Sequence, residues 1–178
     1  MIIIVSGVPR SGTSMTMRIL DMGGISAFHD IEMHKGLNKY GCFERRNHDD
    51  DLNVYEGRCV KSLMPNALFA TPKASYKVIM PVRDPEQVIL SRMRNDMTLE
   101  LFAKRVRQVS RMMDFLRFVI KSRDDMPLLE IPYEDYFTKT EEVVQRIADF
   151  VGVPFDKEKA ILAVDKELYK VRTKDGLR

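Results

Sequence analysis

The stretch MIIIVSGVPRSGTSMTMRIL, residues 1–20, decides the fold of this chain. Its first five residues are apolar and β-prone, and they run into a loop that contains Gly7 and Gly12. Beyond the loop, apolar residues recur at a helical spacing up to Leu20. Glycines let the backbone turn with its N–H groups pointing inward, and the N-terminus of the next helix adds free N–H groups and a partial positive charge. The stretch therefore predicts a strand, an anion-binding loop and a helix.

The loop departs from the commonest nucleotide-binding motif at the position of its cation. A Walker A loop reads GxxxxGK[ST]; here the glycine spacing is kept, but threonine follows the second glycine and the positive charge lies earlier. The string PRSGTS, residues 9–14, resembles the 5′-phosphosulfate loop, P[KR]SGT[ST], of sulfotransferases that use PAPS (3′-phosphoadenosine 5′-phosphosulfate). The residues that would hold the 5′-phosphosulfate by this resemblance are Arg10, Ser11, Gly12, Thr13 and Ser14.

Composition is that of a soluble globular protein, with 44% apolar and 31% charged residues, and the length fits one domain over residues 1–178. A net charge of +3 gives little support to nucleic-acid binding. The apolar N-terminal run is too short for a membrane span or a signal peptide, so we expect a cytoplasmic protein. Cys42 and Cys59 form neither a metal-ligand spacing nor a disulfide framework, which predicts buried free thiols and no metal site.

A polar stretch without clear periodicity covers residues 29–56, and in a compact domain such a stretch is more often functional than idle. We expect it to cover the active site. Within it NKYGCFE, residues 38–44, resembles the NPxGxxE segment of bacterial sulfotransferase-like proteins, with Lys39 at the proline position. This resemblance implies that Glu44 is the general base that takes the proton of the acceptor hydroxyl. The alternatives are a surface ion pair of Glu44 with one of the two arginines that follow, and one histidine of this stretch, His29, His34 or His48, as the base in its place.

Residues 58–64, RCVKSLM, predict the next strand. VKSLMP, residues 60–65, resembles the VKTHLP segment of cytosolic sulfotransferases, in which the lysine and the histidine both serve catalysis. The resemblance implies that Lys61 stabilises the charge that develops on the bridging oxygen of the leaving phosphate. Leu63 occupies the histidine position, which favours Glu44 as the base.

Residues 75–82 predict a buried parallel strand that is followed directly by Arg83. Asp84 and Pro85 then form a strong helix start, and the helix brings Ser91 round two turns later. Arg83 with Ser91 resembles the 3′-phosphate site, RDPxxxxxS, of the same family. A guanidinium at a strand end and a hydroxyl on the following helix can bind one phosphate. The alternatives are an ion pair of the arginine with a nearby carboxylate and a plain surface serine.

The remaining elements expected are a short strand at 25–28, a helix at 98–123, a strand at 127–132, a helix at 140–151 and a last helix at 156–168. An apolar stripe that begins at Leu99 predicts the face by which the 98–123 helix packs on the sheet. The basic tail, residues 170–176, resembles the loop with which the family closes over the 3′-phosphate, and this implies a contact from Arg172. An ordinary frayed terminus is the alternative.

Together the resemblance implies a three-layer P-loop α/β fold, with a central parallel sheet flanked by helices. The implied reaction moves a sulfuryl group from PAPS to an acceptor hydroxyl or amine and releases 3′,5′-ADP, with Glu44, Lys61 and Arg10 as catalytic residues. We expect the acceptor to be a small molecule or a carbohydrate; the sequence does not specify it, and phenol, lipid-headgroup and peptide acceptors all stay open. Two alternatives stay open: a P-loop kinase, which would need a lysine at Thr13 and an acidic magnesium ligand, and a nucleotide-binding module without turnover.

Overall fold

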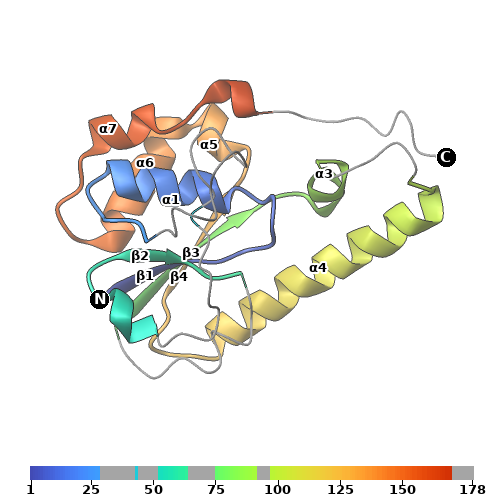
Figure 1. The fold of residues 1–178 in the computed structure, drawn as a ribbon, viewed down its shortest axis with the longest axis horizontal. Helices are drawn as coiled ribbons and strands as arrows, with labels where there is room; N and C mark the ends of the chain where they lie inside the picture. Colours follow the sequence, from blue (N-terminus) through green and yellow to red (C-terminus); the bar gives the residue numbers. More distant parts are fainter. Residues whose placement is uncertain (29–42, 44–51, 64–74, 92–96, 170–178) are drawn as a thin grey trace.

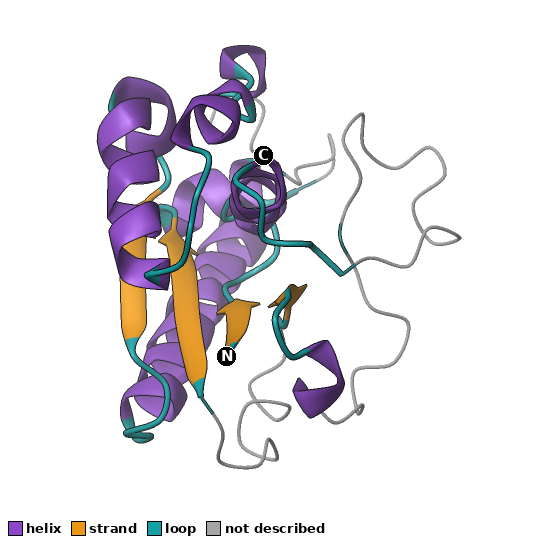
Figure 2. Cartoon of the chain, turned by 90° about the vertical axis from the view of Figure 1, so that its left-hand side faces the viewer, coloured by secondary structure: helices purple, strands orange, loops and turns teal. Residues whose placement is uncertain are grey.

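The computed structural model describes residues 1–28, 43, 52–63, 75–91 and 97–169. The strands in these ranges are β1 (Ile2–Val5), β2 (Cys59–Lys61), β3 (Tyr76–Val82) and β4 (Leu128–Pro132). They form one sheet in the order β2-β1-β3-β4, and all neighbouring strands are parallel (Figure 2). β1 lies inside the sheet, where Ile4 pairs with Val60 on one side and Val78 on the other. The predicted parallel sheet is therefore confirmed.

Helices cover both faces of this sheet. They are α1 (Thr13–Met22), α3 (Pro85–Leu90), α4 (Leu99–Lys121), α5 (Asp135–Thr138), α6 (Thr140–Val151) and α7 (Lys157–Leu162), with 3-10 turns η2 (Leu52–Tyr55) and η3 (Lys166–Leu168). Figure 1 shows α1, α5, α6 and α7 on one face and α4 on the other. In β1, Ile3 and Val5 pack in the core on the α1 side, whereas Ile2 and Ile4 pack with α4. This alternation buries both faces and gives the predicted three layers.

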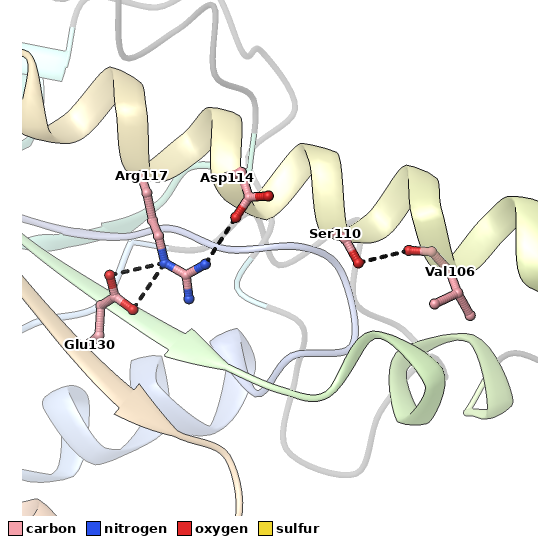
Figure 3. A network of polar contacts seen from close by, with 5 residues as sticks. All are labelled: Val106, Ser110, Asp114, Arg117 and Glu130. Carbon is pink, nitrogen blue, oxygen red and sulfur yellow. Dashed lines mark hydrogen bonds and ion pairs between the residues drawn. The ribbon is translucent and has the colours of Figure 1, made fainter.

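The long helix α4 is joined to the sheet by apolar packing and by one ion pair. Leu116 and Ile120 are fully buried against the sheet, as the apolar stripe predicts. Leu99 is 60% exposed, so the prediction is wrong at this residue, because the N-terminal end of α4 extends beyond the sheet (Figure 1). Figure 3 shows the ion pair, in which the Arg117 Nε donates to both carboxylate oxygens of Glu130 at 3.1 Å. This contact ties the C-terminal part of α4 to β4.

Two predicted elements differ from the structure. The expected strand at 25–28 is reduced to a single parallel bridge between Ala27 and Cys59. The expected helix at 156–168 ends at Leu162, and a separate turn, η3, follows. The break has a local cause, because the Asp165 side chain accepts a hydrogen bond from the backbone N–H of Glu167 and starts a new turn there.

Cys59 is a free cysteine that is fully buried in β2, which confirms the predicted buried thiol. Burial, and secondarily the Asp21 carboxylate, raises the pKa of this thiol, so it stays protonated and unreactive. Cys42 lies outside the described residues. In the described ranges no helix is both long and apolar enough to cross a membrane.

Lys77 joins β3 to the C-terminal end of α6. Its ammonium Nζ donates to the backbone carbonyls of Phe150 at 2.7 Å and Val151 at 3.0 Å, where the helix leaves carbonyl groups unpaired. We expect Lys77→Met to lower the free energy of unfolding by about 1–3 kcal/mol, because both charge-assisted bonds are lost. Urea denaturation would measure this loss. The exposed Lys121→Met serves as the control and should change stability by less than about 0.5 kcal/mol.

Candidate anion-binding site at the carboxyl ends of the strands

The loop between β1 and α1 has a backbone that requires glycine at two positions. Gly7 has φ 150°, and a Cβ there would lie 2.9 Å from the Oγ of Ser11. Gly12 has φ 110°, and a Cβ there would lie 2.9 Å from the Cδ2 of Tyr133. Arg10 itself adopts a left-handed conformation, with φ 77°. The loop is therefore folded back tightly, as the glycine spacing predicts.

This loop leaves the N-terminus of α1 ready to receive an anion. Gly12 is the N-cap and supplies no side-chain hydrogen bond to the first turn, which carries no acidic residue. The Ser11 hydroxyl is fully buried, and none of the described residues forms a hydrogen bond with it. The backbone N–H groups of a helix N-terminus, a buried hydroxyl and the positive end of the helix dipole are the features that bind phosphate groups.

Lys61 reaches this helix end from the neighbouring strand. It is the last residue of β2, only 5% exposed, and its Nζ donates to the Oγ of Ser14 at 3.3 Å. Because β1 and β2 are parallel, the end of β2 lies beside the loop that follows β1. The structure thus brings together Lys61 and Ser14, which the sequence assigned to one site.

Arg83 reaches the same loop from the other side. It directly follows β3, is 6% exposed, and its Nη1 donates to the backbone carbonyl of Arg10 at 3.1 Å. The adjacent Asp84 is the N-cap of α3 and accepts a hydrogen bond from the Gln87 N–H at 3.0 Å, which confirms the predicted helix start. Two buried cations, Lys61 and Arg83, therefore flank the loop. Buried cations at a helix N-terminus create a site for an anion.

The other predicted residues are placed differently. Ser91 ends α3, and its hydroxyl donates to the backbone carbonyl of Val88 at 2.7 Å. A serine hydroxyl has one proton, so it would have to leave Val88 to bind a phosphate. Glu44 and Arg172 lie outside the described residues, although Phe43, next to Glu44, is buried in the core on the α1 side of the sheet.

Tyr133 is a site residue that the sequence analysis missed. It follows β4, its backbone N–H donates to the Val82 carbonyl at 2.7 Å, and its side chain is 7% exposed. The Arg83 guanidinium carbon lies 4.2 Å from the centre of its ring. Burial raises the pKa of Tyr133, and the positive charges of Arg83 and Arg10 oppose this shift. The available signal was its position, because ligands of open parallel sheets bind at the carboxyl ends of the strands.

Comparison with known proteins identifies the family of this chain. Residues 2–176 match the family described as Sulfotransferase domain. The chain belongs to this family. Membership confirms the family predicted from the loop, and with it an enzyme that transfers a sulfuryl group from PAPS. The described part of this sulfotransferase contains no cluster of three or more His, Cys, Asp or Glu side chains that could hold a metal ion.

Solved structures similar to this sulfotransferase share its fold. The sulfotransferase domain from the Synechococcus PCC 7002 olefin synthase has a TM-score of 0.54 and 19% identity, over 92% of this chain and 77% of that one. The sulfotransferase domain from the curacin biosynthetic pathway has a TM-score of 0.57 and 16% identity, over 92% of this chain and 77% of that one. Retinol dehydratase in complex with androsterone and the inactive cofactor PAP has a TM-score of 0.51 and 19% identity, over 93% of this chain and 63% of that one. A search of curated sequences found no match.

Proposed function

We propose that this sulfotransferase binds PAPS through two phosphate subsites and transfers the sulfuryl group to a hydroxyl or amine of a small molecule or carbohydrate. The observation that carries the proposal is the convergence of two buried cations on one loop. Lys61 contacts Ser14 at 3.3 Å, and Arg83 contacts the Arg10 carbonyl at 3.1 Å. We assign the 5′-phosphosulfate to residues 10–14 and the 3′-phosphate to Arg83, with Ser91 and Arg172 as further contacts.

The residues of the loop fit a phosphosulfate group. The hydroxyl of Ser11 is buried without a hydrogen-bond partner among the described residues, and the first turn of α1 has no side-chain cap. Phosphate oxygens would accept hydrogen bonds from this hydroxyl and from the backbone N–H groups of that first turn. Any side chain at Gly7 or Gly12 would meet a protein atom at 2.9 Å, so only glycine lets the loop keep this tight turn. When bound, PAPS supplies an activated sulfuryl group and leaves as 3′,5′-ADP.

We assign the chemistry to three side chains. The Lys61 ammonium lies where it can stabilise negative charge on the phosphate oxygen as its bond to sulfur breaks. Arg10, on the exposed side of the loop, would neutralise charge on the sulfuryl oxygens. Glu44 would take the proton from the acceptor as the acceptor atom forms its bond to sulfur.

The acceptor class is inferred from the family. Retinol dehydratase, which has a similar fold, was solved with androsterone, a small molecule. On this basis we propose a small-molecule acceptor, with a carbohydrate as the alternative. We also propose a single catalytic domain over residues 1–178. The buried free thiol of Cys59 is typical of a reducing compartment and supports a cytoplasmic location.

Calorimetric titration with 3′,5′-ADP, and separately with 5′-ADP and with ATP plus magnesium, tests this proposal. We expect 3′,5′-ADP to bind more tightly than 5′-ADP by about 10- to 100-fold. The reason is that 5′-ADP lacks the 3′-phosphate, and a charge-assisted contact to that phosphate is worth about 1.5–3 kcal/mol. Arg83→Met should abolish this preference.

Arg107→Met, at an exposed position of α4, is the matched control and should keep the preference. Tighter binding of ATP with magnesium would instead support the kinase alternative. Tight binding of 3′,5′-ADP without sulfuryl transfer to any acceptor in a broad panel would support a binding module without turnover.

A further inference from the structure

A buried chain of hydrogen bonds runs from α5 to the phosphate loop. Thr16 in α1 and Tyr136 in α5 are both fully buried, and their hydroxyl oxygens lie 2.6 Å apart. The Thr16 hydroxyl also donates to the backbone carbonyl of Gly12 at 3.3 Å. A threonine hydroxyl has one proton, so with this proton on the Gly12 carbonyl the Tyr136 hydroxyl is the donor to Thr16. Burial raises the pKa of Tyr136, so the phenol keeps the proton that it donates.

This chain ends on the peptide group that joins Gly12 to Thr13. The Gly12 carbonyl accepts a second hydrogen bond, from the backbone N–H of Thr16 at 3.0 Å. A peptide group is planar and trans, so the N–H of Thr13 points away from the Gly12 carbonyl, out of the N-terminus of α1. Gly12 has φ 110° and no Cβ, so its own conformational preference does little to hold this peptide in one orientation. The hydrogen bonds from Thr16 therefore fix the direction of the Thr13 N–H.

We propose that Thr16 and Tyr136 are positioning residues that hold the Gly12–Thr13 peptide, so that the Thr13 N–H is directed at the 5′-phosphosulfate. This inference rests on the proposed function, because it takes residues 10–14 to bind that group. Both side chains are fully buried, so they act through the peptide rather than on the ligand itself. Hydrogen bonds that polarise a carbonyl also strengthen the donor at the other end of the same peptide group.

Nucleotides that differ only in the 5′-phosphate test this role. The affinities of 3′,5′-ADP and 3′-AMP are measured by calorimetry for the wild type, Thr16→Val and Thr16→Ser. Valine keeps the shape of threonine but lacks the hydroxyl, so we expect Thr16→Val to weaken 3′,5′-ADP about fivefold and 3′-AMP less than about twofold. Serine keeps the hydroxyl, so Thr16→Ser should change either affinity less than about twofold. Equal weakening of both nucleotides in Thr16→Val, or no weakening of either, would overturn the proposal.

The double variant, Thr16→Val with Tyr136→Phe, separates positioning from stability. Thr16→Val alone removes the acceptor of the buried Tyr136 hydroxyl, and we expect its Tm to fall by about 4–8 °C. Removing both hydroxyls leaves neither of them buried without a partner, so the double variant should unfold within about 2 °C of the wild type. Its affinity for 3′,5′-ADP should nevertheless stay about fivefold weaker. If that affinity recovered together with the Tm, the two residues would have a purely structural role and the proposal would fail.

The wild type and a milder variant keep the proposal testable even if Thr16→Val does not fold. In the wild type, 3′,5′-ADP should shift the amide proton resonance of Thr13 downfield, as a phosphate oxygen accepts its hydrogen bond, whereas 3′-AMP should not. A Thr13 resonance that did not respond to 3′,5′-ADP would overturn the proposal. Tyr136→Phe keeps the bond from Thr16 to Gly12 and should weaken 3′,5′-ADP about threefold. Tyr76→Phe, at a buried tyrosine that begins β3, is the matched control and should leave both affinities unchanged.

Failure of this inference and failure of the proposed function give different results. If 3′,5′-ADP bound to the wild type no more tightly than 3′-AMP, the proposed function would fail, because the loop would then bind no 5′-phosphate. If 3′,5′-ADP bound more tightly and Thr16→Val kept that preference in full, the proposed function would stand and only the role of Thr16 and Tyr136 would be overturned.

Discussion

Replacing Lys61 by methionine is expected to lower turnover by about 10²–10³-fold while 3′,5′-ADP affinity changes by only a few-fold. The ammonium lies at the end of β2, 5% exposed, with its Nζ 3.3 Å from the Ser14 hydroxyl. In the role proposed for it, this ammonium would interact more strongly with the charge that builds on the leaving phosphate in the transition state than with the ground state. Turnover is measured as release of 3′,5′-ADP from PAPS in the presence of a panel of phenols and carbohydrates.

The exposed Lys104→Met on α4 is the control for this experiment, and its turnover should match that of the wild type. In Lys61→Met, the loss of turnover relative to the loss of 3′,5′-ADP affinity decides the role of Lys61. If affinity for 3′,5′-ADP fell as much as turnover, Lys61 would contribute to binding alone. Unchanged turnover would show that its contact with Ser14 has no part in the reaction.

Glu44→Gln is expected to lower turnover by about 10²–10⁴-fold and to leave 3′,5′-ADP affinity unchanged. A general base acts on the acceptor proton and not on the nucleotide, so the loss should be confined to the transfer step. Glutamine keeps the size and hydrogen-bonding shape of the side chain but cannot take up the proton. Turnover is measured as release of 3′,5′-ADP from PAPS, and the affinity for 3′,5′-ADP by calorimetry.

The matched control for Glu44→Gln is Glu142→Gln, at an exposed position of α6. It should leave both turnover and the affinity for 3′,5′-ADP unchanged. Wild-type turnover in Glu44→Gln would favour the alternative in which Glu44 pairs with a neighbouring arginine. A loss of 3′,5′-ADP affinity equal to the loss of turnover would place Glu44 at the nucleotide rather than at the acceptor.

The sequence by itself determined those strands and helix ends that are specified by residues next to them in the chain. Five apolar residues before a glycine loop specify β1 and the start of α1, because the strand propensity, the glycine conformations and the helical spacing all lie within residues 1–20. Asp84 and Pro85 likewise specify the start of α3, and Gly152, with φ 66°, ends α6 as expected. The loop motif also identified the family, because its cation position and its glycine spacing are both local features.

Only the tertiary structure decided which side chains meet. Lys61 contacts Ser14 across 47 positions of sequence, and Arg83 contacts the Arg10 carbonyl across 73 positions. Both contacts arise because parallel strands end at the same edge of the sheet, and the register that aligns them depends on packing between distant segments. For the same reason Tyr133 escaped notice. The sequence around an aromatic residue that follows a strand does not predict which guanidinium its ring will contact. Only the alignment of β4 with β3 places the ring of Tyr133 against Arg83 and the loop.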